Sequence, residues 1–185
     1  MIFLYSSIIK NKLNKLYNLK KLNKYDNNTY NYYYKLGLEQ IIPILKEYAD
    51  TINETFLEKL IYQDDIDIMF YSSNTEFALK NCQGIIIWTK TLNSSKEEKI
   101  YLLLLCIQKY YRKYGYGTVF LQEFIEFIKI QNTKSKRIIL HSIETSVNFY
   151  KSVGFTEVPD KPSNYKKLFK FEKYNKKALL LNLQL

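Results

Sequence analysis

The chain has 185 residues, a formal net charge of +10 and 46% hydrophobic residues, enough apolar material for the core of one domain. Its two cysteines, Cys82 and Cys106, lie far apart, and His141 is its single histidine, so the sequence supports neither a disulfide framework nor a metal site. The basic balance suits nucleic acid, but lysine runs are more often simply solvated, so we do not expect a nucleic-acid partner.

Residues 1–37 form a basic, low-complexity segment that we interpret as an extension of a domain spanning residues 38–185. The segment holds seven lysines and one acidic residue, Asp26. Its opening, "MIFLYSSII", is too short to cross a bilayer and lacks a clear cleavage site. We therefore expect a disordered or loosely docked tail on a cytoplasmic protein, and we leave open a role in touching a membrane or in organelle targeting.

The sequence of the first part of the domain predicts helices followed by three strands. Residues 38–60 have apolar side chains at helical spacing, with Pro43 near an end or bend. The alternating "DIDIMFY" and the apolar "GIIIWTK" predict hairpin strands at residues 66–71 and 84–90. The run "KIYLLLLCI", residues 99–107, is continuously apolar after its opening lysine, which predicts a central strand covered on both faces.

The second part continues the alternation, which is typical of an α/β fold. Residues 117–131 carry an apolar stripe opposite Glu123 and Glu126, as an amphipathic helix should. "RIILHS", residues 137–142, predicts another buried strand. Residues 143–153 fit a short helix that ends at Gly154, residues 155–158 are extended, and "ALLLNLQL" is the expected last strand.

The segment "RKYGYG", Arg112–Gly117, joins the central strand to the amphipathic helix. The start of a helix leaves amide N–H groups that point at one place, and the helix dipole adds partial positive charge, so an anion such as a pyrophosphate is favoured there. Gly115 and Gly117 allow close approach to the backbone, and Arg112 adds a cation at the rim. The spacing fits neither the dinucleotide nor the Walker fingerprint, and an ordinary turn with two glycines stays the alternative.

Two motifs in this order resemble those of the GNAT superfamily of acetyl-CoA-dependent N-acetyltransferases. "RKYGYG" fits the acyl-donor signature Gln/Arg-x-x-Gly-x-Gly/Ala, and "NFYKSVGF", Asn148–Phe155, is similar to the second marker, aromatic-Tyr-Lys-x-x-Gly-Phe. The resemblance covers residues 66–183. It implies an enzyme of α/β (α+β) class with the GNAT fold, a central mixed, mostly antiparallel twisted sheet flanked by helices, and acetyl-CoA as co-substrate.

The resemblance also implies which residues serve the donor. The carbonyl of the thioester would meet backbone N–H groups where the central strand splays, and Tyr150 would lie near the coenzyme sulfur and meet the departing thiolate. The residues implied for donor binding are Leu105, Cys106, Ile107, Arg112, Lys113, Tyr114, Gly115, Tyr116, Gly117, Thr118 and Tyr150.

Within the superfamily, "IYLLLLCIQKYYRKYGYGT" resembles most the catalytic subunit of N-terminal acetyltransferase E. That resemblance puts Tyr101 and His141 in catalytic places, with His141 taking the proton of the amine through a water that Tyr101 holds. From the residues alone, a lone histidine on a buried strand is more often a core residue. A partner subunit or a ribosome as partner is left open.

The resemblance also extends to the acceptor. "IIPI" resembles a substrate-gripping loop, which implies peptide binding by Ile42, Pro43 and Ile44 on one side and by Tyr165 from a late hairpin loop on the other. We therefore predict acetylation of peptides that begin with Met followed by an apolar residue.

Two other functions stay open. The stretch between the candidate histidine and Tyr150 is shorter than in the peptide-acetylating subfamily, and its spacing resembles glucosamine-6-phosphate N-acetyltransferase. Against that alternative, or another small-molecule amine as acceptor, Leu103 and Leu104 replace the acidic pair that the sugar-phosphate enzyme carries. The third alternative is a GNAT domain without catalysis that serves only for binding.

Overall fold

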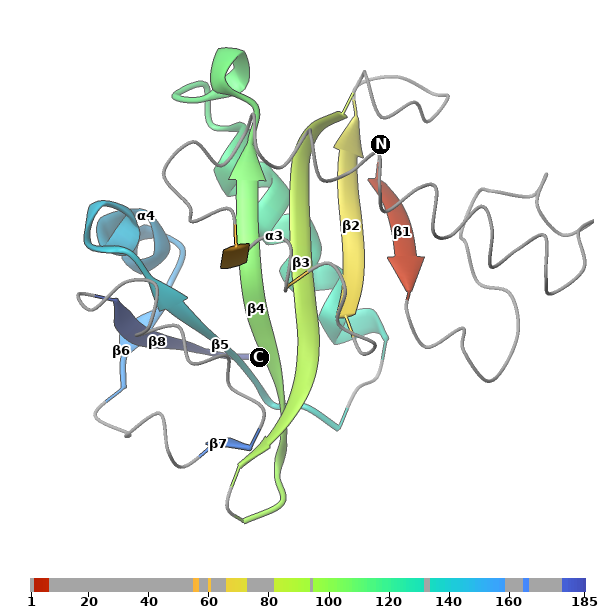
Figure 1. Cartoon of the computed structure of the whole chain (residues 1–185), viewed down its shortest axis with the longest axis vertical. Helices are drawn as coiled ribbons and strands as arrows, with labels where there is room; N and C mark the ends of the chain where they lie inside the picture. The colour runs from red at the N-terminus through yellow and green to blue at the C-terminus, as the bar shows by residue number, and fades with distance from the viewer. Residues whose placement is uncertain are drawn as a thin grey trace, which may run out of the picture. The chain divides into compact units, whose positions relative to one another are not determined.

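The computed structural model describes residues 2–6, 55–56, 60, 66–72, 82–93, 95–131, 134–158, 165–166 and 178–185 (Figure 1). The chain divides into two compact units, the first made of Met1–Ile86 and Cys106–Tyr114, the second of Ile87–Leu105 and Gly115–Leu185. Two long strands, β3 (Cys82–Asn93) and β4 (Glu98–Ile107), contribute residues to both units.

The first unit contains an antiparallel pair that includes the very start of the chain. Strand β1 (Ile2–Ser6) pairs with β2 (Ile66–Ser72), with Ile2 opposite Tyr71, and β2 neighbours β3. The expectation of a disordered or loosely docked tail is therefore wrong for these first residues. The segment "IFLY" is rich in residue types that favour strands, and its partner strand lies more than sixty positions along the chain.

In the second unit the hydrogen-bonded strand order is β3-β4-β5-β8-β6, with the short β7 (Tyr165–Lys166) paired to β3 off this path. Strand β5 (Arg137–Ser142) runs parallel to β4, whereas β8 (Leu179–Gln184) is antiparallel to both β5 and β6 (Thr156–Glu157). The predicted class, a mixed but mostly antiparallel sheet with helices, is confirmed, and so is the interior place of the apolar strand β4.

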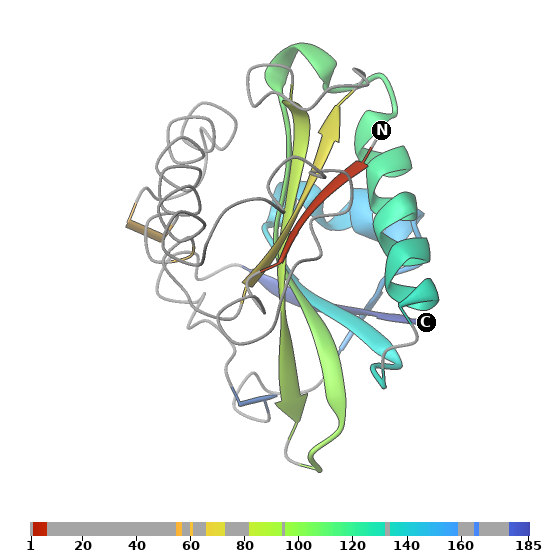
Figure 2. The ribbon, with the colours of Figure 1, turned by 90° about the vertical axis from the view of Figure 1, so that its right-hand side faces the viewer.

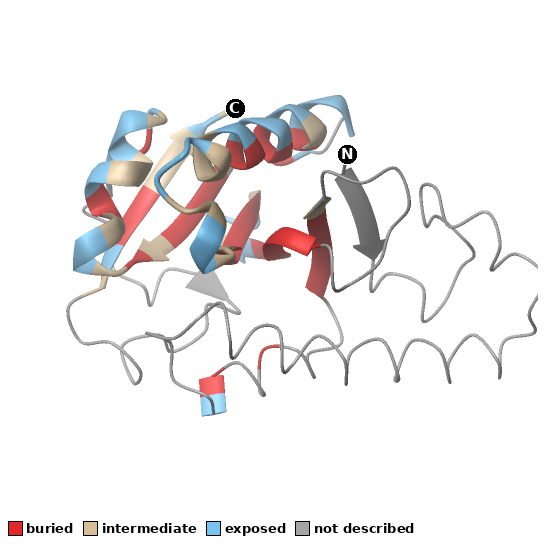
Figure 3. Cartoon of the chain, turned by 90° about the horizontal axis from the view of Figure 1, so that it is seen from above, coloured by how far each residue is buried: buried red, intermediate tan, exposed pale blue. Residues whose placement is uncertain are grey.

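Helix α3 (Tyr116–Ile130) covers strands of the second unit, as Figure 2 shows. Its buried residues follow the predicted stripe and face the strands, while its outer side is exposed (Figure 3). The ring of Phe124 lies 5.1 Å from that of Trp88 on β3, centroid to centroid, and both side chains are buried. Burial of this aromatic pair anchors α3 on β3.

The remaining elements agree closely with the predicted ones. The short helix predicted over residues 143–153 is the 3-10 turn η5 (Glu144–Ser146) followed by α4 (Val147–Ser152), and a second 3-10 turn, η4 (Lys109–Tyr111), follows β4. Of the helices predicted at residues 38–60, the structure describes three helical residues, of which Phe56 and Leu60 are fully buried. None of the helices in the described ranges is long and apolar enough to span a membrane.

Candidate active site

Tyr101 on β4 and His141 on β5 form a direct hydrogen bond. The Tyr101 hydroxyl oxygen lies 2.8 Å from His141 Nδ1, and the two rings meet edge to face. The parallel register explains this contact, because Tyr101 stands opposite Ile139, and His141, two residues further along β5, projects from the same face of the sheet. Tyr101 is buried and His141 half-buried, so the pair lies in an environment largely shielded from water.

The pair lies where the two parallel strands part. Their registered pairing runs from Ile100 opposite Ile138 to Leu102 opposite Leu140, whereas β4 continues to Ile107. Leu105 and Ile107 therefore lie beyond the last residue that is paired with β5. This arrangement is the one that the predicted backbone donors for a thioester carbonyl would need, and their role stays a prediction.

The glycine turn before α3 has the conformation that only glycine adopts easily. Gly115 caps the helix in the left-handed region, with φ 83°, and its carbonyl accepts the first helical hydrogen bond, from the Val119 amide at 3.1 Å. No side chain caps the helix and its first turn carries no acidic residue. A Cβ added at Gly115 would meet nothing within 4 Å, so open space lies in front of the backbone there.

Arg112 and Lys113 have local roles that the sequence did not reveal. The Arg112 Nε–H donates to the backbone carbonyl of Ile107 at 2.8 Å, which ties the turn back to the last residue of β4. Lys113 is held at φ 70°, an uncommon conformation for a residue with a side chain. Tyr114 is 77% exposed, so its ring is not part of the hydrophobic core. The turn is thus fixed by backbone geometry and one arginine rather than by burial.

Tyr150 is positioned by the end of its own short helix. The Phe155 amide donates to the Tyr150 carbonyl and the Gly154 amide to the Lys151 carbonyl, both at 3.0–3.1 Å, which is the Schellman pattern. Gly154 takes the required left-handed conformation, with φ 100°, and the rings of Tyr150 and Phe155 lie 5.6 Å apart. The marker "YKSVGF" is therefore a helix stop that fixes the place of a half-buried tyrosine.

The Cys82 thiol is not an activated nucleophile. Both cysteines are free and buried, and the Cys82 thiol donates to the Gly84 carbonyl. Burial raises the pKa of Cys82 to about 12, so the thiol stays protonated at neutral pH. In the ranges that the structure describes, no group of three His, Cys, Asp or Glu is placed to hold a metal ion.

The structure describes only one of the four predicted acceptor-binding residues. Ile42, Pro43 and Ile44 lie outside the described residues. Tyr165 is the first residue of β7, and its backbone stands opposite Asn93 at the end of β3. The structure thus brings together Tyr101 and His141, and it leaves the peptide-gripping role of the other four residues a prediction.

A family model described as "Acetyltransferase (GNAT) domain" matches residues 44–178, well over half of the chain. The chain belongs to the GNAT acetyltransferase family. No curated protein sequence matches the chain.

Solved structures share the GNAT fold at low identity. GCN5 from Tetrahymena has a TM-score of 0.59 at 16% identity, covering 80% of this chain and 85% of that one. NAA60 from Arabidopsis thaliana, solved with acetyl-CoA, gives 0.56 at 16%, covering 80% and 93%. The PaiA N-acetyltransferase from Thermoplasma acidophilum, solved with coenzyme A, gives 0.52 at 17%, covering 80% and 92%. These likenesses show the fold.

Proposed function

We propose that this GNAT enzyme transfers the acetyl group of acetyl-CoA to the N-terminal α-amine of peptides or proteins. The observation that carries the proposal is the 2.8 Å contact between Tyr101 and His141, made by neighbouring strands at the point where their pairing ends. It supplies a proton acceptor on the face of a GNAT sheet. The nearest chemical precedent is the resemblance to the catalytic subunit of N-terminal acetyltransferase E.

The donor binds at the start of α3. The pyrophosphate of acetyl-CoA is an anion, and the first-turn amides of Gly117 and Thr118 have no acceptor within the helix. The left-handed Gly115 carries no side chain, and the space where its Cβ would lie is open, which leaves the backbone accessible to the anion. Solved acetyl-CoA and coenzyme A complexes of NAA60 and of the PaiA enzyme support the same donor.

Acetyl transfer needs a neutral amine, and an α-amine loses its proton readily enough that a weak base suffices. Its reference pKa is about 7.7 to 8.0, so roughly a tenth to a quarter is neutral near pH 7, whereas a lysine side chain near 10.4 is almost wholly charged. The amine nitrogen attacks the thioester carbonyl carbon, the new C–N bond forms and the C–S bond breaks. One amine proton must leave, and the thiolate must be stabilised.

Tyr101 and His141 accept that proton as a pair. When neutral His141 carries its own proton on Nε2, the Tyr101 hydroxyl donates to Nδ1 and keeps lone pairs for the proton of the amine or of a water. As the phenol oxygen accepts that proton, its own proton moves to Nδ1. The direct contact between Tyr101 and His141 is compatible with the expected water, which Tyr101 would hold between the amine and the pair. Tyr150, held by the helix stop, donates to the departing thiolate.

Binding of the donor is tested by thermal shift. Acetyl-CoA at about 100 times its dissociation constant adds about 2.7 kcal/mol to the free energy of unfolding, which raises Tm by about 5–10 °C in a chain of this size. Acetyl-pantetheine lacks the pyrophosphate and should give a much smaller shift at the same concentration. Equal shifts for the two compounds contradict the assignment of the pyrophosphate to the glycine turn. No shift with acetyl-CoA favours the alternative of a domain without catalysis.

A further inference from the structure

Asn93 closes the turn between β3 and β4 with its backbone and its side chain. Its amide donates to the Glu97 carbonyl at 3.1 Å, and its carbonyl accepts from the Lys96 amide at 3.0 Å. Its Oδ1 accepts hydrogen bonds from the Ser95 hydroxyl at 3.0 Å and from the Glu97 amide at 2.8 Å, and its Nδ2 donates to Glu97 Oε2 at 3.0 Å. Lys96 is held at φ 62°, a conformation that lysine adopts only when its surroundings keep it there. Asn93 therefore specifies the shape of this hairpin end.

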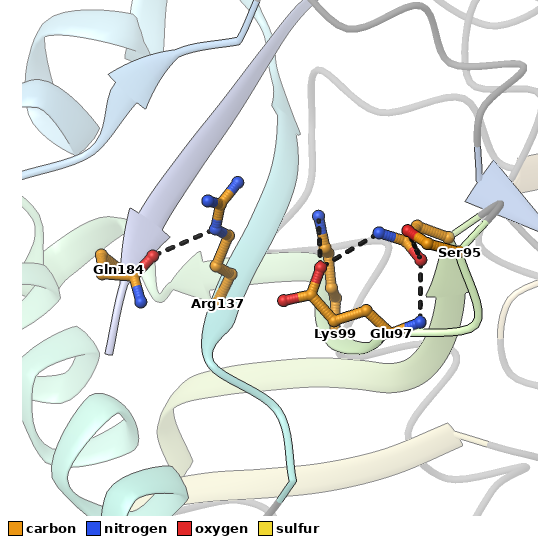
Figure 4. Close-up of polar contacts among 6 residues, drawn as sticks. Ser95, Glu97, Lys99, Arg137 and Gln184 are labelled. Carbon is orange, nitrogen blue, oxygen red and sulfur yellow. Dashed lines mark hydrogen bonds and ion pairs between the residues drawn. The ribbon is translucent and has the colours of Figure 1, made fainter.

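A buried cation extends this network into β4. Lys99 is 3% exposed, and its Nζ lies 3.6 Å from Glu97 Oε2, the oxygen that also accepts from Asn93. Figure 4 shows Glu97 between Lys99 and the side chains of the turn. Lys99 precedes Tyr101 by two residues on β4 and so projects from the same face of the sheet. One carboxylate thus links the hairpin end to the strand that carries the catalytic tyrosine.

The same hairpin end carries β7. Leu92 stands opposite Lys166 and Asn93 opposite Tyr165, and these two antiparallel pairs are the pairing of β7 in the described part of the sheet. Asn93 therefore has two tasks, because its side chain closes the turn while its backbone faces that of Tyr165. A two-residue strand has little stability of its own, so its place depends on the strand end to which it pairs.

We propose that Asn93, Glu97 and Lys99 are positioning residues for the acceptor. They hold the end of β3 in one geometry, and through the β3–β7 pairing they set the place of Tyr165, the residue assigned to the acceptor loop. The inference rests on the proposed function, in which Tyr165 contacts the acceptor. The donor site at the start of α3 contains none of these residues, so their loss should change acceptor binding and leave donor binding unchanged.

Steady-state kinetics with acetyl-CoA and a peptide acceptor test the functional part. Asn93→Ala should raise KM for the acceptor about tenfold and leave KM for acetyl-CoA unchanged. Glu97→Gln keeps an oxygen that accepts from Asn93 and loses the charge facing Lys99, so its effect should be smaller. Lys90→Ala is the matched control, because Lys90 is an exposed partner of Glu98 in the same hairpin, outside the network, and should behave as wild type.

Amide exchange of Tyr165 and Lys166, followed by NMR, tests the structural part without any turnover. Asn93→Ala should speed exchange at both amides, while Lys90→Ala should not. Unchanged exchange in Asn93→Ala overturns the positioning role, whatever the acceptor is. Faster exchange with an unchanged acceptor KM overturns the link to the acceptor. If no peptide is acetylated by the wild type, the proposed function fails, and the exchange data still decide whether the network positions β7.

Discussion

Substitution of Gly115 tests directly whether acetyl-CoA binds at the start of α3. The Gly115 φ of 83° lies in the left-handed region, and a Cβ there meets nothing within 4 Å. Gly115→Ala should therefore cost only backbone strain, about 1–2 kcal/mol of unfolding free energy. In a chain of this size that lowers Tm by about 2–8 °C. The affinity for acetyl-CoA should fall by more than this small loss of folding stability accounts for.

Asparagine separates strain from obstruction at this site, because it tolerates the left-handed region better than other residues with a side chain. Gly115→Asn should remain close to wild type in stability, yet its side chain projects into the space assigned to the pyrophosphate. Gly154→Asn is the matched control. Gly154 follows a different helix, α4, and has a similar φ of 100°. Its added Cβ makes only a contact of 3.4 Å, with Leu183 on β8.

The assay is thermal shift with and without saturating acetyl-CoA, supported by calorimetry. Wild type and Gly154→Asn should both gain about 2.7 kcal/mol at 100 times the wild-type dissociation constant. Gly115→Asn should gain at least about 1.4 kcal/mol less, the equivalent of a tenfold weaker affinity. Full stabilisation of Gly115→Asn by acetyl-CoA refutes the reasoning, since the side chain would then stand in space that the donor does not use.

Three further predictions follow from the described contacts. Tyr101→Phe and His141→Ala should each lower kcat at pH 7 by about 100-fold or more and leave KM for acetyl-CoA unchanged. The loss in kcat should become smaller as pH rises past the amine pKa near 8. Wild-type rates in both variants from pH 6 to 9 would exclude the pair as the proton acceptor. Because the pKa of Cys82 is raised from 9.0 to about 12, its thiol stays protonated in the folded state, so the stability it contributes is complete below pH 9 and is lost as pH rises toward 12. Urea unfolding should show Cys82→Ala losing about 1 kcal/mol less than wild type between pH 8 and 10, and parallel curves would contradict this. Phe124→Ala should cost about 3–5 kcal/mol in the same assay, because it leaves a cavity against Trp88, and a loss below about 1 kcal/mol would mean that α3 is not anchored there.

Patterns that depend on neighbours in the chain predicted the structure well. The apolar run within residues 99–107 identified an interior strand, and the apolar stripe of residues 117–131 identified α3 within one residue at each end. The glycine turn and Gly154 were recognisable because few residues tolerate their backbone angles, and the structure finds Gly115 and Gly154 at positive φ.

Features that depend on pairing between distant segments could not be predicted from local sequence patterns. The register of β4 on β5 decides that Tyr101 and His141 touch directly, and no local pattern sets that register. The pairing of β1 with β2 likewise joins the start of the chain to a strand far along it. Asn93 could have been suspected from "LNSSKEE", where an asparagine opens a polar turn, but its link to β7 depends on the fold.

The proposed acceptor is tested most directly by offering competing amines in one reaction. Peptides that begin with Met and an apolar residue are incubated beside glucosamine-6-phosphate with labelled acetyl-CoA, and mass spectrometry locates the label; His141→Ala serves as the inactive control. The account predicts label on the peptide α-amine, absent from lysine side chains and strongly reduced in the variant. Label on the sugar phosphate alone would contradict it, and would show that the shorter spacing between His141 and Tyr150 was the better guide to the acceptor.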